Sequence, residues 1–218
     1  FRFPTKIMLS SGAISKLSSS LKELNINKPI IVTDANLVSM DFFSKILDSL
    51  TKQKIVVKIF SGCFGNPTEE QVRLGVEVFK KHKSDGIIAI GGGCPLDVAK
   101  AINLLSTHDG QVCDYEDGVR TSLPIVDNLA PMIAIPTTAG TGSEVGGSFV
   151  VSEKGSGKKI IVWSPYLLPK LVIADPGRPD FNEYCRYCEK KYPSDLEFIA
   201  GTVNGKTTKV FSISFLRL

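Results

Sequence analysis

The sequence has 218 residues, of which 43% are hydrophobic and 22% charged, and its formal net charge is +4. The length suits one α/β domain with a short further segment, and the composition is that of a globular chain, which excludes a disordered one. The charge is too small and too evenly spread to favour nucleic acid as a partner, and no apolar run is long enough to span a membrane.

Hydrophobic patterns predict an alternation of helices and buried strands along the chain. Apolar residues at helical spacing predict helices over residues 12–24 and 42–50, and a third from Thr68 to the basic run near residue 81. Thr68 with Gln71 three residues later fits a capping box, which marks the start of that third helix. Short continuous apolar runs predict strands over residues 29–33, 55–60, 86–90, 131–136 and 171–174.

The second half of the chain combines these strands with longer connections. Residues 91–95, Gly-Gly-Gly-Cys-Pro, lead into a helix over 96–102 with the proline in its first turn. Residues 106–130 are predicted to be a long polar connection, and apolar stretches at 149–151 and 159–163 to be a β-hairpin. Strands alternating with helices predict a Rossmann-like α/β fold, with a mostly parallel sheet, helices on both faces and ligand-binding loops at one edge.

The cysteines and the first residues bear on cellular location. An odd number of irregularly spaced cysteines indicates reduced thiols and not a disulfide framework. The last two form a C-x-x-C pair, which would be half of a zinc site, but the sequence offers no second ligand pair, so we do not expect zinc there. No charged leader with an apolar stretch precedes Phe3, so we expect no export signal and a cytoplasmic protein. The cysteines are Cys63, Cys94, Cys113, Cys185 and Cys188.

Two loops rich in glycine follow predicted strands. Three glycines, at 91–93, stand between a strand and a helix, where they let the backbone approach a ligand and leave helix amides free for a pyrophosphate. A tight strand-to-helix turn explains them equally well, and the general dinucleotide fingerprint is not met, because Leu96 occupies its third glycine position. The second loop, residues 137–144, offers hydroxyls and amides to a ribose or phosphate, and is also compatible with a plain surface turn.

The motifs, taken in order, resemble the iron-containing (group III) alcohol dehydrogenase family. Residues 91–100, Gly-Gly-Gly-Cys-Pro-Leu-Asp-Val-Ala-Lys, resemble its GGGSPxDxAK signature. Residues 136–144, Pro-Thr-Thr-Ala-Gly-Thr-Gly-Ser-Glu, resemble its PTTAGTGSE signature. The segments 32–34, 66–68, 164–169 and 175–176 fall in the expected order. The resemblance implies the N-terminal domain of a dehydroquinate synthase-like fold.

The resemblance implies which residues bind the cofactor. Asp34 would accept hydrogen bonds from the adenosine ribose and repel a 2′-phosphate, which favours NAD over NADP; without the family, Asp34 would be a helix cap. The pyrophosphate would lie on the glycine amides and the Cys94 amide, and Asp97 and Lys159 would lie towards the nicotinamide. The implied set is Asp34, Asn66, Gly91, Gly92, Gly93, Cys94, Asp97, Thr137, Thr138, Thr141, Gly142, Ser143 and Lys159.

Two departures from the family lie inside this set. Cys94 replaces a serine, so a weaker donor is expected to loosen the phosphate contact. After Glu144 the family has a threonine and a bulkier residue, whereas residues 145–148 here are Val-Gly-Gly-Ser. We therefore expect the next strand to have a more mobile start.

The resemblance also implies an activity. Family members are oxidoreductases that interconvert an alcohol with an aldehyde or ketone, using NAD and iron or another divalent metal that polarises the substrate oxygen. We therefore expect a small-molecule alcohol or carbonyl substrate and a homo-oligomer, with no nucleic-acid or membrane partner. Two alternatives remain: a non-catalytic dinucleotide-binding module, and a fragment of a relative such as glycerol dehydrogenase or hydroxyacid–oxoacid transhydrogenase.

The resemblance ends near residue 176, where the family continues into a helical domain whose aspartate and three histidines hold the metal. This sequence has two histidines, His82 and His108, both earlier and both predicted at the surface. We expect residues 1–176 to form an NAD-binding domain, residues 177–218 to be an unassigned tail, and the chain to stop before the helical domain. Such a chain would bind dinucleotide but would not be catalytic alone, with neither metal ligands nor catalytic residues. Apolar residues near the end fit an edge strand or an exposed segment: Val210, Phe211, Ile213 and Phe215.

Overall fold

A six-stranded parallel sheet forms the centre of the computed structural model, which describes residues 5–138, 140–175, 197–203 and 206–212. The strand order is β1-β8-β5-β4-β2-β3, and every neighbouring pair runs parallel, as the sequence predicted. The six strands are β1 (Lys6–Leu9), β2 (Pro29–Asp34), β3 (Lys58–Cys63), β4 (Gly86–Gly91), β5 (Met132–Pro136) and β8 (Leu171–Ala174).

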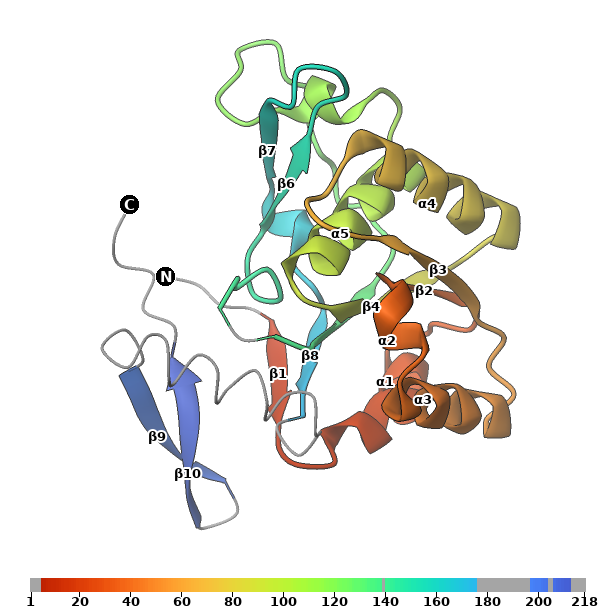
Figure 1. The fold of residues 1–218 in the computed structure, drawn as a ribbon, viewed down its shortest axis with the longest axis vertical. Coiled ribbons are helices and arrows are strands. Elements are labelled where there is room, and N and C mark those ends of the chain that lie inside the picture. The colour runs from red at the N-terminus through yellow and green to blue at the C-terminus, as the bar shows by residue number, and fades with distance from the viewer. Residues whose placement is uncertain (1–4, 139, 176–196, 204–205, 213–218) are drawn as a thin grey trace.

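Helices cover both faces of this sheet (Figure 1). The helical elements are η1 (Ala13–Lys16), α1 (Leu17–Glu23), α2 (Ala35–Val38), α3 (Asp41–Lys52), α4 (Glu69–His82), α5 (Gly93–Thr107), η2 (Val112–Tyr115) and η3 (Pro165–Leu167). Helices α1 and α3 pack on one face, and α4 and α5 on the other. Because both faces are covered, the central strands are apolar at successive positions. Ile87, Ile88, Ala89 and Ile90 of β4 are all fully buried.

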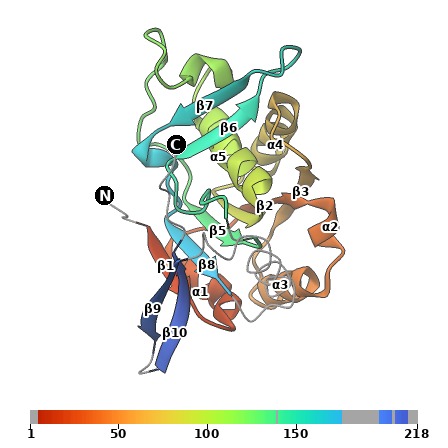
Figure 2. The ribbon, with the colours of Figure 1, turned by 60° about the vertical axis from the view of Figure 1, so that its left-hand side comes forward.

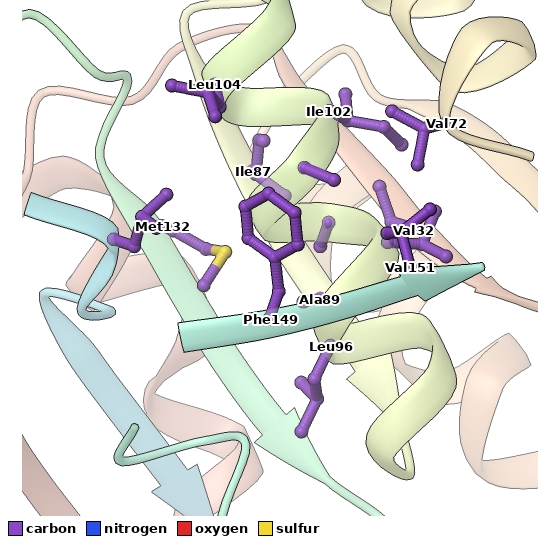
Figure 3. Close-up of a cluster of buried hydrophobic side chains, with 14 of the residues drawn as sticks. Val32, Val72, Ile87, Ala89, Leu96, Ile102, Leu104, Met132, Phe149 and Val151 are labelled. Carbon is purple, nitrogen blue, oxygen red and sulfur yellow. The ribbon is translucent and has the colours of Figure 1, made fainter. Parts of the chain in front are cut away.

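A β-hairpin, β6 (Ser148–Ser152) and β7 (Lys159–Trp163), extends the α5 side of the core, as predicted. Its inward residues alternate with outward ones, and Phe149 points from β6 into the apolar cluster beside Met132 (Figure 3). The hairpin lies along α5 (Figure 2). This packing places the hairpin next to the helix that follows the first glycine loop.

Some observed elements differ from the predicted ones. The strand expected over 55–60 begins at Lys58. Helix α3 ends at Lys52, and Ile55 belongs to the turn that follows it, where its amide donates to the Leu50 carbonyl over 3.0 Å. Strand β1 was not predicted, since its pairing with β8 depends on residues far along the chain. The first turn of the predicted 12–24 helix is the 3-10 helix η1.

The described C-terminal segments, residues 197–203 and 206–212, lie outside the central sheet. Strands β9 (Glu197–Val203) and β10 (Lys206–Ser212) pair antiparallel in a separate two-stranded sheet. Val210 and Phe211 therefore belong to a strand, as one of the two expected alternatives had it, but this strand is not at the edge of the central sheet. The C-x-x-C pair, Ile213 and Phe215 lie outside the described residues. Within the described part of the chain, no helix combines the length and apolarity needed to cross a membrane.

Candidate functional site

The predicted site loops meet at the carboxyl edge of the sheet, because they follow four neighbouring parallel strands, β5, β4, β2 and β3. From β4 the chain runs through α5 to β5, whereas from β2 it runs the opposite way through α3 to β3. The strand order therefore reverses between β4 and β2. Open α/β sheets bind ligands at this kind of switch point.

The first glycine loop leaves the beginning of α5 open. Gly92 is the N-cap and supplies no side-chain hydrogen bond, and the Leu96 amide donates to the Gly92 carbonyl over 3.3 Å. The Gly93 and Cys94 amides precede that bond, so they have no partner within the helix. Gly91 has a φ of 148°, and a Cβ there would lie 2.5 Å from Cγ of Pro95. The turn thus requires glycine at 91 and presents free amides at 93 and 94.

The two glycine loops lie against each other. A Cβ on Gly92 would lie 2.8 Å from Oγ1 of Thr138, and a Cβ on Gly93 would lie 2.9 Å from Cγ2 of Thr141. The buried Thr137 donates its amide to the Gly91 carbonyl over 3.0 Å. The structure therefore brings together the glycines and threonines of two motifs that are more than forty residues apart in the sequence.

The second loop turns back on itself after the threonines. Gly142 has a φ of 67°, and its carbonyl accepts the Val145 and Gly146 amides at 3.1 and 2.9 Å. The Ser143 amide donates to Oγ1 of Thr141 over 3.4 Å. These bonds fold residues 141–146 into a compact turn beside the start of α5.

Asp34 caps a helix in this structure. Its Oδ1 accepts the Asn36 and Leu37 amides at 2.9 and 3.0 Å and so begins the short helix α2, which was not predicted. Both hydrogen bonds use Oδ1, so capping does not consume the Oδ2 acceptor. Asn66 is exposed in the loop after β3, and its carbonyl accepts Nε2 of Gln71 at 3.4 Å.

The predicted capping box is half formed. Oγ1 of Thr68 accepts the Gln71 amide at 3.3 Å, but the Gln71 side chain does not accept the Thr68 amide in return. Nε2 of Gln71 donates instead to the Phe64 carbonyl at 2.8 Å. Oε1 of Gln71 also accepts the Cys94 thiol at 3.7 Å. Burial, followed by the charges of Asp97 and Asp34, raises the pKa of Cys94 to about 11. Cys94 thus bonds within the protein through its side chain, and its amide is the group free for a ligand.

Asp97 and Lys100 connect α5 to the hairpin. Oδ2 of Asp97 accepts the Val150 amide at 3.1 Å; burial raises the pKa of Asp97, while Lys100, the Val150 amide and Ser143 oppose the rise. Lys100 is 1% exposed, and its Nζ donates to the Gly146 carbonyl at 2.6 Å and the Ser148 carbonyl at 2.7 Å. Burial lowers the pKa of Lys100 to about 8.

The sequence motif at residues 91–100 includes Lys100, but the sequence alone did not indicate a role for this lysine. The available signal was a single lysine among the apolar residues of the buried helix α5. The expectation of a more mobile strand start stays a prediction; in the structure, Lys100 binds two carbonyls within residues 146–148. Moreover, a Cβ on Gly147 would lie 2.8 Å from the Ser164 carbonyl oxygen, so glycine at position 147 lets this backbone approach residue 164 closely.

Lys159 and the two histidines make no hydrogen bond to the glycine loops in the described part of the chain. Lys159 is exposed on β7 opposite Ser152, and its ammonium makes no hydrogen bond or ion pair with the described residues. His82 and His108 are half-buried, contrary to the prediction that both lie at the surface. Nε2 of His108 accepts the Val126 amide at 3.0 Å, so this ring helps to hold the long connection in place.

No metal centre was found in the part of the chain that the structure describes. There, no group of three or more histidine, cysteine, aspartate or glutamate side chains could hold a metal ion. A cavity of about 560 Å³ lies elsewhere, between α4, the end of α5 and residues 108–112, and none of the predicted cofactor-binding residues lines it. The groups that the described residues present at the candidate site are backbone amides, hydroxyls and the carboxylates of Asp34 and Asp97.

Comparisons with known proteins match the part of the chain that carries both glycine loops. The family model described as iron-containing alcohol dehydrogenase matches residues 4–176. The chain is 38% identical over 173 residues to 4-hydroxybutyrate dehydrogenase of Cupriavidus necator, covering 79% of this chain and 44% of that protein. It thus spans less than half the length of this curated relative.

Solved structures show the same partial coverage. A 1,3-propanediol oxidoreductase superposes with a TM-score of 0.74 at 34% identity, over 79% of this chain and 44% of that one. Sulfoacetaldehyde reductase from Bifidobacterium kashiwanohense, solved in complex with NAD+, gives a TM-score of 0.74 at 28% identity, over 81% and 46%. The likeness therefore covers the sheet and both glycine loops.

Proposed function

Because the chain belongs to the iron-containing alcohol dehydrogenase family, we propose that residues 1–176 form the NAD-binding domain of an oxidoreductase. Its reaction is the interconversion of a small alcohol with the corresponding aldehyde or ketone. The 1,3-propanediol oxidoreductase and sulfoacetaldehyde reductase relatives support this class of reaction. We propose a cytoplasmic protein, and a homo-oligomer stays an expectation.

The observation that carries the proposal is the uncapped start of α5 beneath the second glycine loop. Free amides at Gly93 and Cys94, with the positive end of a 15-residue helix behind them, attract an anion. A Cβ on Gly92 or Gly93 would fill the space between the two loops. This cradle fits a pyrophosphate, which needs close backbone approach on several sides.

The remaining residues would orient the two ends of the dinucleotide. Asp34, through Oδ2, would accept the ribose hydroxyls, and Asn66 would lie near the adenosine. Asp97 and Lys159 would lie towards the nicotinamide, which accepts or donates the hydride when the cofactor is bound. Adenine and its ribose would contact the second loop, through Thr137, Thr138, Thr141, Gly142 and Ser143.

Titration calorimetry of NAD into the 218-residue chain tests the proposal. We expect saturable one-to-one binding, with weaker binding of NADP. Failure of NAD to bind the folded chain, as judged by circular dichroism, would contradict the proposal.

For the 218 residues alone, we propose dinucleotide binding without turnover. The family's metal is held by one aspartate and three histidines, whereas this sequence has two histidines, and the Nε2 of one of them, His108, binds a backbone amide. We therefore derive no step through a metal. Reduced cofactor should not accumulate with short alcohols or diols in the presence of ferrous iron or zinc. Turnover that depends on a stoichiometrically bound metal would show the proposal to be wrong.

A further inference from the structure

One face of α5 contacts the second glycine loop, residues 137–144, and the segment 146–150 that follows it. Gly93, Asp97 and Lys100 have the i, i+4 and i+7 spacing that places side chains on one side of a helix. Gly93 lies against Thr141, and Asp97 binds the Val150 amide. Lys100 binds the carbonyls of residues 146 and 148, which lie in the sequence between these two contact points. The position of the second loop relative to α5 therefore depends on this face.

Lys100 makes the contact with the most buried charge. Its ammonium donates to Gly146 and Ser148 over 2.6 and 2.7 Å, which are charge-assisted hydrogen bonds. On the other side of the same segment, the Ser164 amide donates to the Gly147 carbonyl at 2.9 Å. Residues 146–148 are thus held between α5 and the end of β7.

Two carboxylates face the Lys100 ammonium. Asp97 comes from the same helix, and Glu144 comes from the loop itself. Oε2 of Glu144 is buried and has no hydrogen-bond partner among the described residues. The ammonium is therefore the charge that offsets two buried carboxyl groups next to the dinucleotide cradle.

We propose that Lys100 is a positioning residue that fixes the second glycine loop against α5 and so sets the gap in which the dinucleotide binds. This inference rests on the proposed function. Without the two carbonyl bonds, residues 146–148 lose their hold on α5. Thr138 and Thr141, which lie a few residues earlier in the chain, then no longer keep a constant distance from the Gly92 and Gly93 backbone.

The ionisation of Lys100 supplies a test, because burial lowers its pKa to about 8. Above that pH the amine keeps two hydrogens but loses the charge that faces Asp97 and Glu144, so NAD affinity should fall. Global stability should move the other way. The pKa of Lys100 in the folded chain lies below the usual lysine value of 10.5, so between about pH 8 and 10.5 the unfolded chain binds more protons and stability rises with pH.

The chain contains its own reporter for this segment. Trp163 is the only tryptophan, and it pairs with Ser148 across the hairpin. Its fluorescence therefore follows the residues that Lys100 binds. NAD affinity, Trp163 emission and urea unfolding are to be measured between about pH 6.5 and 9.5, a range that brackets the lowered pKa. The variants are Lys100→Met, Lys100→Arg and, as a matched control, Lys158→Met on the exposed hairpin turn.

As the pH rises, we expect the NAD affinity of the wild type to fall and its Trp163 emission to change, both with a midpoint near pH 8. Lys100→Met should bind NAD roughly tenfold more weakly at neutral pH, since it loses charged hydrogen bonds, and should show no midpoint. Lys100→Arg keeps its charge throughout, so it should retain part of the affinity without the midpoint. Lys158→Met should behave as the wild type.

Three results would overturn the inference. If folded Lys100→Met binds NAD as tightly as the wild type, the inference is wrong, while the proposed function stands. The same midpoint in the wild type and Lys100→Arg would also overturn the inference, and this comparison decides the matter if Lys100→Met does not fold. Absence of NAD binding by the wild type would contradict the proposed function, and the inference with it.

Discussion

Helices α4 and α5 lie side by side on one face of the sheet, and both begin at its carboxyl edge, yet their first turns are built differently. The start of α4 is satisfied from within the chain, because Oγ1 of Thr68 accepts the Gln71 amide and two acidic residues, Glu69 and Glu70, stand in the first turn. The start of α5 has glycine as its N-cap, no side-chain hydrogen bond and no acidic residue in its first turn.

The difference shows which helix start is available to a ligand. Side-chain capping and acidic residues stabilise the positive end of α4, so it offers little to an anion. The first turn of α5 keeps its free amides and its positive end, and it lies beneath the threonines of the second loop. Binding at this edge should therefore depend on α5, and stability on α4.

Gly92→Val should have the largest effect, the loss of measurable NAD binding. The valine would occupy the space between the α5 amides and the second loop, where Cβ alone would lie 2.8 Å from Oγ1 of Thr138. The φ of Gly92 is −82°, so the backbone itself tolerates a side chain, and the fold should survive once the Thr138 hydroxyl shifts. Calorimetry and circular dichroism measure the two effects separately.

A double-mutant cycle distinguishes a ligand role for Gly92 from a packing role. Thr138→Ala removes the atom that a Cβ on Gly92 would meet first, so Gly92→Ala combined with Thr138→Ala relieves the internal contact. If the double variant still binds NAD far more weakly than Thr138→Ala, the methyl group obstructs the ligand. Full recovery to the affinity of Thr138→Ala would mean that Gly92 only lets the loops pack.

Asp34→Asn should have an intermediate effect, because β2 ends in a residue that is predicted both to cap and to bind. Asparagine caps a helix about as well as aspartate, so α2 should persist while the charge is lost. We expect the wild type to prefer NAD, and the variant to change the NAD-to-NADP affinity ratio by roughly tenfold, since repulsion of the 2′-phosphate disappears. Equal wild-type affinities for NAD and NADP would remove the ribose assignment, and Asp34→Gly provides a second, uncharged comparison.

Thr68→Ala should have the smallest effect on binding and a clear one on stability. Loss of the cap on α4 should lower the free energy of unfolding by about 1 kcal/mol. The NAD dissociation constant should stay within error of the wild type, because α4 is not expected to contact the ligand. Urea unfolding and calorimetry measure both quantities, and a large loss of NAD affinity would show that the two helix starts are not independent.

Local patterns predicted the central strands and long helices because covering helices make those strands continuously apolar. They did not predict β1, whose four residues are ordered by pairing with β8. They also missed the exact start of β3, because the apolar Ile55 belongs to the turn after α3 and not to the strand. The family motifs identified the glycine loops. The contact between Gly92 and Thr138, and the carbonyls that Lys100 binds, depend on tertiary packing that no local spacing encodes.

The pairing of β1 with β8 also bears on how the chain is made. Asp175, at the end of β8, accepts the Gly12 amide at 2.9 Å and the Ile14 amide at 3.1 Å, although these residues are 163 and 161 positions apart from it. At a synthesis rate of roughly 5–20 residues per second, the first strand waits on the order of ten seconds for its partner to emerge from the ribosome. The middle of the sheet can assemble during that interval, whereas β1 joins last, with its backbone groups unpaired until then.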